Sequence, residues 1–222
     1  MPIEWQVSPL GPALANGEVH LWLASADQEP RGIDFLSDDE RAHAARFQFE
    51  DDRRLWTTSR VLLHVVLGRY FDTDPRSVEL ATVARGRRVV RRPGDSEWLA
   101  FSHARSGQLG VVAVARSMSI GVDLERIRGD LDFVAIARRA FGDDVADRLV
   151  LLPGEGQGPE FFRTWVREEA RGKCRGTGLV EPDDAARATA AFVSDVDFKT
   201  GYAGALAATA DPAIVLGCAT EV

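Results

Sequence analysis

Two acidic side chains that stand two residues apart are the first candidates for chemistry. Asp123 and Glu125 belong to the segment Gly-Val-Asp-Leu-Glu at 121–125. Alternate side chains of a strand share one face, so a strand here would place both carboxylates on the same side. Adjacent carboxylates repel each other unless a positive charge lies between them, and Mg²⁺ prefers oxygen ligands of this kind. The pair indicates a metal site or, alternatively, a solvated strand end paired with Arg126 or Arg128.

A helix predicted over 160–175 carries the second group of candidates. Residues four apart lie on one face of a helix, which aligns Trp165, Glu169 and Lys173. One interpretation of the Glu169–Lys173 spacing is an exposed ion pair that contributes roughly a few tenths of a kcal/mol. The chain, however, contains 25 arginines and only two lysines, Lys173 and Lys199. A lysine in an arginine-rich helix indicates a need for a compact point charge, or for a group that can release a proton.

A third segment, Phe-Ser-His-Ala at 101–104, lies at the end of a predicted strand. Ser102 and His103 are neighbours there, and neighbouring strand positions face opposite sides. They are therefore not expected to form a nucleophile–base pair. His103 is instead a candidate hydrogen-bond donor to a phosphate group, or a structural histidine.

The helices that must position these groups follow from capping signals and apolar spacing. Ser37 is a predicted N-cap, and Glu40 three residues later completes a capping-box pattern. Further helices are predicted from Asp51 through the segment LWTTSRVLLHVVLGRYF, over 132–141 and over 160–175. The glycine-rich segment 153–160 is predicted to be a loop.

The predicted strands are short and fall in both halves of the chain. They cover 18–24, 78–84, 87–91, 98–102, 109–115, 119–125, 189–194, 202–208 and 213–219. The strands at 109–115 and 119–125 are expected to pair around a turn at 116–118, and the last three to form a meander. Helices and strands of this kind in each half predict the α+β class.

Charge and composition exclude some classes of protein. The 222 residues carry a net charge of −7, which argues against a nucleic-acid-binding protein that uses a broad basic face. No segment approaches the roughly 20 apolar residues of a membrane span, and the N-terminal residues lack the pattern of a signal peptide. Cys174 and Cys218 are expected to be free thiols in a reducing cytoplasm.

Together, these motifs resemble those of the 4′-phosphopantetheinyl transferases of the larger, surfactin-synthetase-activating (Sfp) type. The resemblance runs from about Leu36 to Leu179. It begins with Ala-Arg-Phe at 45–47 and continues with Phe-Ser-His at 101–103. Its two specific motifs are G-V-D-L-E at 121–125 and W-V-R-E-E-A-R-G-K at 165–173. Their joint occurrence in the family's order is what makes the signal strong.

The resemblance implies a monomer made of two similar lobes, a pseudo-dimer. Each lobe would be a small, mostly antiparallel sheet packed with helices, and the active-site cleft would lie at their interface. Residues 1–116 would form the lobe that contacts the phosphates of coenzyme A. Residues 117–222 would form the lobe with the metal ligands and the catalytic helix.

The implied reaction moves the phosphopantetheine arm of coenzyme A onto a serine of an acyl or peptidyl carrier protein and releases 3′,5′-ADP. Asp123, Glu125 and Glu169 would hold Mg²⁺, and Glu169 would take the serine proton. Lys173 would neutralise charge on the phosphates or protonate the leaving group. The positions that match coenzyme A contacts are Arg46, Arg87, Ser102 and His103. The chain length favours carriers of polyketide and nonribosomal-peptide biosynthesis by family analogy alone.

Several positions depart from the family pattern. Glu168 replaces the first lysine of the helix motif, and Glu40 and His43 replace lysines that face the 3′-phosphate. The usual G-K-P turn reads Gly86-Arg87-Arg88, within a basic run from 85 to 92. That run either supplies the positive patch that attracts coenzyme A or forms a solvated hairpin. Two alternatives to the transferase are therefore a coenzyme A- or carrier-binding protein without turnover, and a Mg²⁺-dependent phosphohydrolase.

Overall fold

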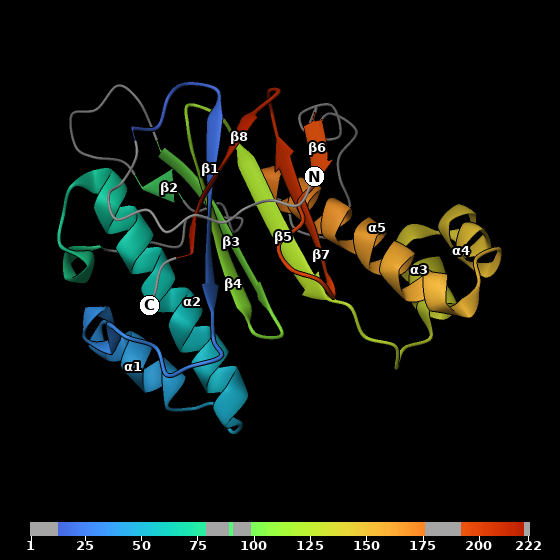
Figure 1. Cartoon of the computed structure of the whole chain (residues 1–222), viewed down its shortest axis with the longest axis horizontal. Helices are drawn as coiled ribbons and strands as arrows, with labels where there is room; N and C mark the ends of the chain where they lie inside the picture. The colour runs from blue at the N-terminus through green and yellow to red at the C-terminus, as the bar shows by residue number, and fades with distance from the viewer. Residues whose placement is uncertain (1–12, 79–88, 91–98, 176–191, 220–222) are drawn as a thin grey trace.

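The computed structural model describes residues 13–78, 89–90, 99–175 and 192–219, and its helices and strands form an α+β fold (Figure 1). The strands are β1 (Glu18–Ser25), β2 (Val89–Val90), β3 (Leu99–Ser106), β4 (Leu109–Arg116), β5 (Ile120–Arg126), β6 (Phe192–Asp195), β7 (Tyr202–Ala208) and β8 (Ala213–Ala219). The α-helices are α1 (Asp38–Ala44), α2 (Glu50–Phe71), α3 (Phe133–Phe141), α4 (Asp143–Val150) and α5 (Gly154–Arg175), and short 3-10 turns lie at Ile33–Phe35 and Pro75–Ser77.

The strands form two separate sheets. The first sheet has the order β2-β3-β4-β1-β8, and the second has the order β5-β7-β6. Neighbouring strands are antiparallel except β1 and β8, which are parallel. The chain passes from the first sheet to the second between β4 and β5, but β8 returns to the first sheet.

Two predicted strand pairings are wrong because the edges they need are occupied. β4 pairs along its length with β1 on one edge and with β3 on the other, so no edge is left for β5. β5 pairs with β7 instead. β7 in turn has β5 and β6 on its two edges, so β8 joins the free edge of β1 and does not continue a meander.

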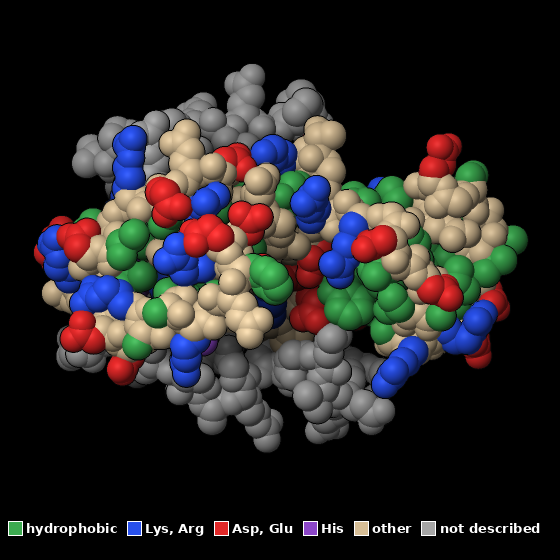
Figure 2. All heavy atoms as spheres, turned by 90° about the horizontal axis from the view of Figure 1, so that it is seen from below, with side chains coloured by type: hydrophobic (Ala, Val, Ile, Leu, Met, Phe, Trp, Pro, Cys, Tyr) green, Lys and Arg blue, Asp and Glu red, His purple; other side chains and the backbone are tan. Residues whose placement is uncertain are grey.

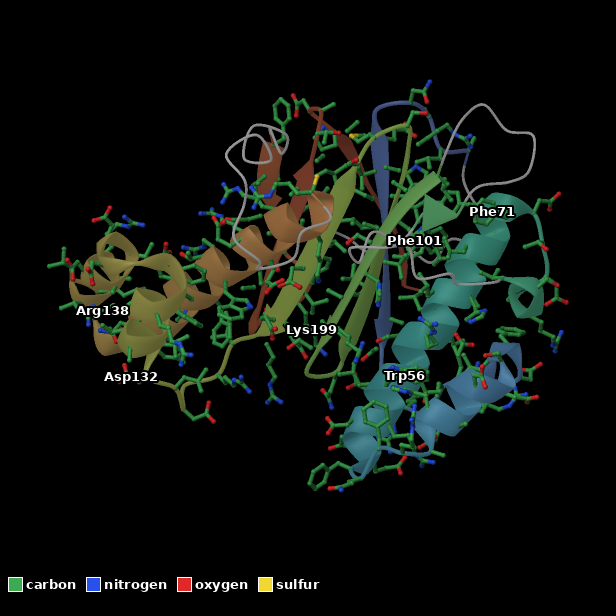
Figure 3. All side chains as sticks on the ribbon, turned by 180° about the vertical axis from the view of Figure 1, so that it is seen from behind. Trp56, Phe71, Phe101, Asp132, Arg138 and Lys199 are labelled. Atoms are coloured by element: carbon green, nitrogen blue, oxygen red, sulfur yellow. The ribbon has the colours of Figure 1, made fainter. Side chains whose placement is uncertain are left out.

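The two sheets are the inner layers of the molecule, and α2 and α5 are the outer ones (Figure 1). Strand β4 shows why the sheets lie inside: its apolar side chains continue without interruption, so both of its faces must be covered, and both are buried. Val111 faces the core between the sheets, and Val112 faces α2. Phe101 of β3 also packs on the α2 side, where Phe71 covers the same cluster (Figure 3).

The predicted helices are largely confirmed, with one correction. Ser37 caps α1 in a complete capping box with Glu40. The segment 153–160 was expected to be a loop, but from Gly154 onward it belongs to α5, although it contains Pro159. Its glycines allow close packing, because a Cβ at Gly158 would lie 3.1 Å from the ring of Phe133 in α3.

Some predicted features lie outside the described residues. These are most of the strands at 78–84 and 87–91 and nearly all of the basic run, Arg87 included. Among the described helices, none is both long enough and apolar enough to cross a membrane.

Candidate active site

The candidate residues meet where α5 packs against β5. Gly121 makes this contact possible: a Cβ there would overlap the carbonyl oxygen of Ala170 and the amide nitrogen of Cys174, and would lie 2.9 Å from Cβ of Lys173. Val122 and Leu124 point the other way, into the core between the sheets. The strand alternation expected for this motif therefore turns its acidic side chains away from that core.

Lys173 joins the helix to both sheets. Its ammonium group donates a hydrogen bond of 2.7 Å to Oδ1 of Asp123 and one of 3.1 Å to the carbonyl oxygen of Val122. A longer bond of 3.4 Å reaches the carbonyl oxygen of His103 on β3. The lysine that stood out in the sequence is thus directed at the D-x-E strand and is half-buried there.

Asp123 is a carboxylate in an apolar setting. Burial, together with smaller effects of the nearby Glu125 and Glu169, raises its pKa to about 6, and Lys173 opposes this rise. Its second oxygen, Oδ2, is buried and has no hydrogen-bond partner among the described residues. A buried acceptor without a partner is costly, so this atom is suited to receive a ligand.

Glu169 lies one helical turn before Lys173, and its carboxylate interacts electrostatically with Asp123 on β5. Burial raises the pKa of Glu169, Lys173 opposes the rise, and Glu125 adds to it. The three carboxylates therefore act on one another electrostatically. Figure 2 shows acidic side chains in a hollow between the α1–α2 side of the molecule and the α3–α5 side.

The carboxylates do not form a closed metal cluster as they stand. Across the described ranges, no three His, Cys, Asp or Glu side chains come close enough together to hold a metal ion. At Asp123, Oδ1 accepts a hydrogen bond from Lys173. The metal-ligand roles of Asp123, Glu125 and Glu169 remain predictions.

Two predicted phosphate contacts lie on β3. The Oγ of Ser102 accepts a hydrogen bond from the amide of Val122 at 3.0 Å, and the side chain is buried. Ser102 thus connects the two sheets. His103, next to it, is half-buried, and its carbonyl oxygen accepts the bond from Lys173.

Arg46 follows α1 and contacts Nδ1 of His43 at 2.7 Å. The His43 ring lies 4.8 Å from that of Trp56 on α2, between ring centroids (Figure 3). Arg87, the remaining predicted contact, lies outside the described residues.

Sequence reasoning missed a cationic group between α2 and β3. Burial lowers the pKa of Arg105, the neighbouring Arg60 lowers it further, and Asp52 opposes them. The guanidinium of Arg60 also lies 5.9 Å from the ring centroid of Trp56. Arg60 also donates to Oε1 of Glu40, so part of the positive charge of the two guanidinium groups is already balanced. The spacing of Arg60 and Arg105 does not indicate that they are neighbours, because only the packing of α2 on β3 brings them together.

The chain was compared with known proteins. No protein-family model matches it. It is 33% identical over 184 residues to the 4′-phosphopantetheinyl transferase HetI of Nostoc sp., an alignment that covers 81% of this chain and 78% of HetI. The chain belongs to the 4′-phosphopantetheinyl transferase family.

Other phosphopantetheinyl transferases match over a similar stretch. Sfp of Bacillus subtilis is 25% identical over 160 residues, which cover 72% of this chain and 69% of Sfp. The transferase psf-1 of Bacillus pumilus is 31% identical over 145 residues, which cover 65% of this chain and 60% of psf-1. The family that the motifs predicted is confirmed, and the chain is an enzyme of the transferase class.

Proposed function

We propose that the chain transfers the 4′-phosphopantetheine group of coenzyme A to a serine of an apo-carrier protein and releases 3′,5′-ADP. The observation that carries the proposal is the contact of Lys173 with Asp123, in a chain of the phosphopantetheinyl transferase family. That contact unites the two motifs that were about forty residues apart in the sequence.

We place the reaction in a cleft between two similar lobes, residues 1–116 and residues 117–222. Strand β8 belongs to the second of these ranges but pairs with β1 in the first sheet. Two facts support the likeness of the lobes: each sheet carries one long helix on its outer face, and α2 and α5 each have 22 residues. The hollow in Figure 2 lies between the side of the molecule that carries α2 and the side that carries α5.

We assign Asp123, Glu125 and Glu169 as ligands of Mg²⁺. Carboxylate oxygens suit this ion, and Oδ2 of Asp123 is a buried acceptor that lacks a partner. Burial raises the pKa values of Asp123 and Glu169, and the repulsion from neighbouring carboxylates that adds to the rise would be relieved by a cation. The ion would supply charge neutralisation on the pyrophosphate of coenzyme A.

The chain's own residues then position the substrates and move protons. Glu169 is half-buried beside the other carboxylates, and we assign it to take the proton of the carrier serine through its position rather than its basicity, because a bound cation would lower its pKa. The serine oxygen forms a bond to the phosphorus that bears pantetheine, and the bond from that phosphorus to 3′,5′-ADP breaks. Lys173 faces the same group of carboxylates and would neutralise or protonate the leaving phosphate.

The nucleotide end of coenzyme A carries several negative charges. We propose that Ser102, His103, Arg46 and Arg87 contact its phosphates, and that the Arg60–Arg105 pair adds positive charge on the α2 side. Support comes from the pKa of Arg105, which is lowered by burial and, in addition, by the charge of the neighbouring Arg60. As partners we propose acyl or peptidyl carriers of polyketide or nonribosomal-peptide biosynthesis, served by a monomer in the cytoplasm.

One assay separates this proposal from its alternatives. The protein is incubated with coenzyme A, Mg²⁺ and an apo-carrier, and both the carrier mass and 3′,5′-ADP are measured. We expect the carrier to gain the mass of one phosphopantetheine group, with 3′,5′-ADP formed in equal amount. Formation of 3′,5′-ADP without a carrier would contradict transfer and favour a phosphohydrolase. Coenzyme A binding with neither product would favour a binding protein.

A further inference from the structure

The hydroxyl group of Ser106 makes two hydrogen bonds whose directions are fixed by chemistry. Ser106 ends β3 in the first sheet, and its Oγ lies 2.5 Å from Oε2 of Glu125 and 3.1 Å from the amide nitrogen of Arg126, both on β5. A backbone N–H can only donate, so Oγ accepts from Arg126. The single hydroxyl proton is therefore left to donate to the Glu125 carboxylate.

A second serine on β3 shows what is special about this contact. Ser102 lies four residues before Ser106, and the β5 amides that they accept from, Val122 and Arg126, are also four residues apart. The two hydroxyls thus hold β5 against β3, although the strands belong to different sheets. Within the described part of the chain, Ser106 also bonds to an acidic side chain, that of the half-buried Glu125, whereas Ser102 accepts from a backbone amide.

We propose that Ser106 is a positioning residue, which fixes the Glu125 carboxylate so that its second oxygen is presented to a divalent cation. This inference rests on the proposed function, which makes Glu125 a ligand of that cation. A carboxylate held through one oxygen has fewer orientations to lose on binding, and the bond keeps it close to Asp123 on the same strand face. The contact crosses from one sheet to the other, so the first sheet contributes to a metal site on the second.

The decisive test compares two variants of nearly equal shape, Ser106→Thr and Ser106→Val. Threonine keeps the hydroxyl and valine replaces it with a methyl group. Binding of Mn²⁺ to the whole protein without coenzyme A is followed by electron paramagnetic resonance. We expect near wild-type affinity for the Thr variant and about tenfold weaker binding for the Val variant, as is common when a partner of a metal ligand is lost. Equal Mn²⁺ affinity of the two variants would overturn the proposal.

Two further variants separate this inference from the function on which it rests. Glu125→Gln should weaken Mn²⁺ binding, and adding Ser106→Val to it should cause no further loss. If Glu125→Gln binds Mn²⁺ like the wild type, the assigned metal site itself is wrong. If it weakens binding while the Thr and Val variants agree, only the role of Ser106 is wrong.

A matched control tests whether loss of any serine–carboxylate bond gives the same effect. Ser25 ends β1, and its Oγ donates to Oδ2 of Asp27 at 2.7 Å. Ser25→Ala should leave Mn²⁺ affinity unchanged, and an effect as large as that of Ser106→Val would contradict a specific role. In the transfer reaction, Ser106→Val should need more Mg²⁺ to reach half-maximal rate and keep most of its kcat at saturating Mg²⁺. A purely structural defect would lower kcat at every Mg²⁺ concentration.

Discussion

Lys173 donates to oxygen atoms on two strands that belong to different sheets: Asp123 and Val122 on β5, and His103 on β3. A lysine ammonium group is compact and can direct its three protons at three acceptors. An arginine guanidinium is planar and longer, so it cannot occupy the same place between these oxygens. This geometry gives a physical reason for a lysine in a helix whose other basic residues are arginine.

Lys173→Arg is therefore an informative substitution at the residue scale. It keeps the positive charge and changes the shape, so we expect kcat for transfer to fall by about 100-fold, as when a preorganised donor is lost from an active site. The control is Lys199→Arg, at the chain's other lysine, which is exposed in the turn before β7, 3.9 Å from Asp27 (Figure 3). Steady-state kinetics should show that control near wild type. Full activity of Lys173→Arg would show that charge alone is required.

The contact between β5 and α5 is the element that positions the acidic residues. Gly121→Ala would place a methyl group against the backbone of α5 at Ala170 and Cys174. We expect it to destabilise the fold by about 1–3 kcal/mol and to lower transfer activity. Gly129→Ala is the control, because a Cβ at Gly129 meets nothing within 4 Å, and urea unfolding should show it within about 0.5 kcal/mol of wild type. Equal unfolding midpoints for both variants would contradict a tight β5–α5 contact.

Helix α1 is held to α2 by a half-buried acidic residue, Glu40. Glu40 accepts hydrogen bonds from Arg60 and from Nε2 of His64, and Nδ1 of His64 lies 2.9 Å from the carbonyl oxygen of Pro75. Both ring nitrogens of His64 thus face oxygen atoms, one on α1 and one in the turn after α2. Glu40 is thus the centre of a group of hydrogen bonds and ion pairs between α1 and α2.

This group predicts a specific pH dependence of stability. Burial alone would raise the pKa of Glu40, but hydrogen bonds from His64, the Ser37 amide and Arg60 lower it from 4.5 to about 2. A lowered folded-state pKa stabilises the protein above pH 4.5, and that contribution is lost as the pH falls toward 2. Glu40→Gln should cost on the order of 3 kcal/mol at pH 7.

The measurement is chemical denaturation of wild type and Glu40→Gln across this pH range. The difference in unfolding free energy should shrink between pH 4.5 and pH 2. Asp39→Asn, a change at an exposed neighbour in α1, is the control and should show little pH-dependent difference. A constant difference for Glu40→Gln would contradict the assigned ion pairs.

Across the whole molecule, local patterns predicted elements better than they predicted neighbours. The Ser37–Glu40 capping box and the apolar run of β4 were read correctly, because each depends on residues close in sequence. The partners of β5 and β8 were not, because they depend on which strand edges are already occupied. The start of α5 was predicted to be a loop because it is rich in glycine, and composition alone does not reveal that Gly158 packs against Phe133 of α3.

In the candidate site, too, local patterns could be predicted from the sequence, whereas contacts between distant segments could not. The sequence predicted that Asp123, Glu125, Glu169 and Lys173 would act together, through motif resemblance and face alternation. It did not predict the contact between Lys173 and Asp123, because that requires the docking of α5 on β5. The Ser106–Glu125 bond and the Arg60–Arg105 pair arise from packing between segments remote in the sequence.

The core between the sheets also makes a prediction about cooperativity. Val111 of β4 and Leu124 of β5 belong to one buried cluster that spans both sheets. We therefore expect the sheets to unfold together rather than as separate lobes. Hydrogen exchange should give similar opening free energies for the amides of β4 and β7. A β7 that exchanges at a much lower free energy would show that the second sheet opens independently.

The most direct test of the account compares two neighbouring glutamates in the transfer reaction. Glu169 is the assigned base, whereas Glu168 forms an ion pair with Arg171 on the same helix. Intact-mass spectrometry of an apo-carrier, with coenzyme A and Mg²⁺, should show addition of phosphopantetheine by the wild type and by Glu168→Gln at similar rates. Glu169→Gln should be at least about 100-fold slower with an unchanged fold. Equal carrier modification by both variants would contradict the assigned active site.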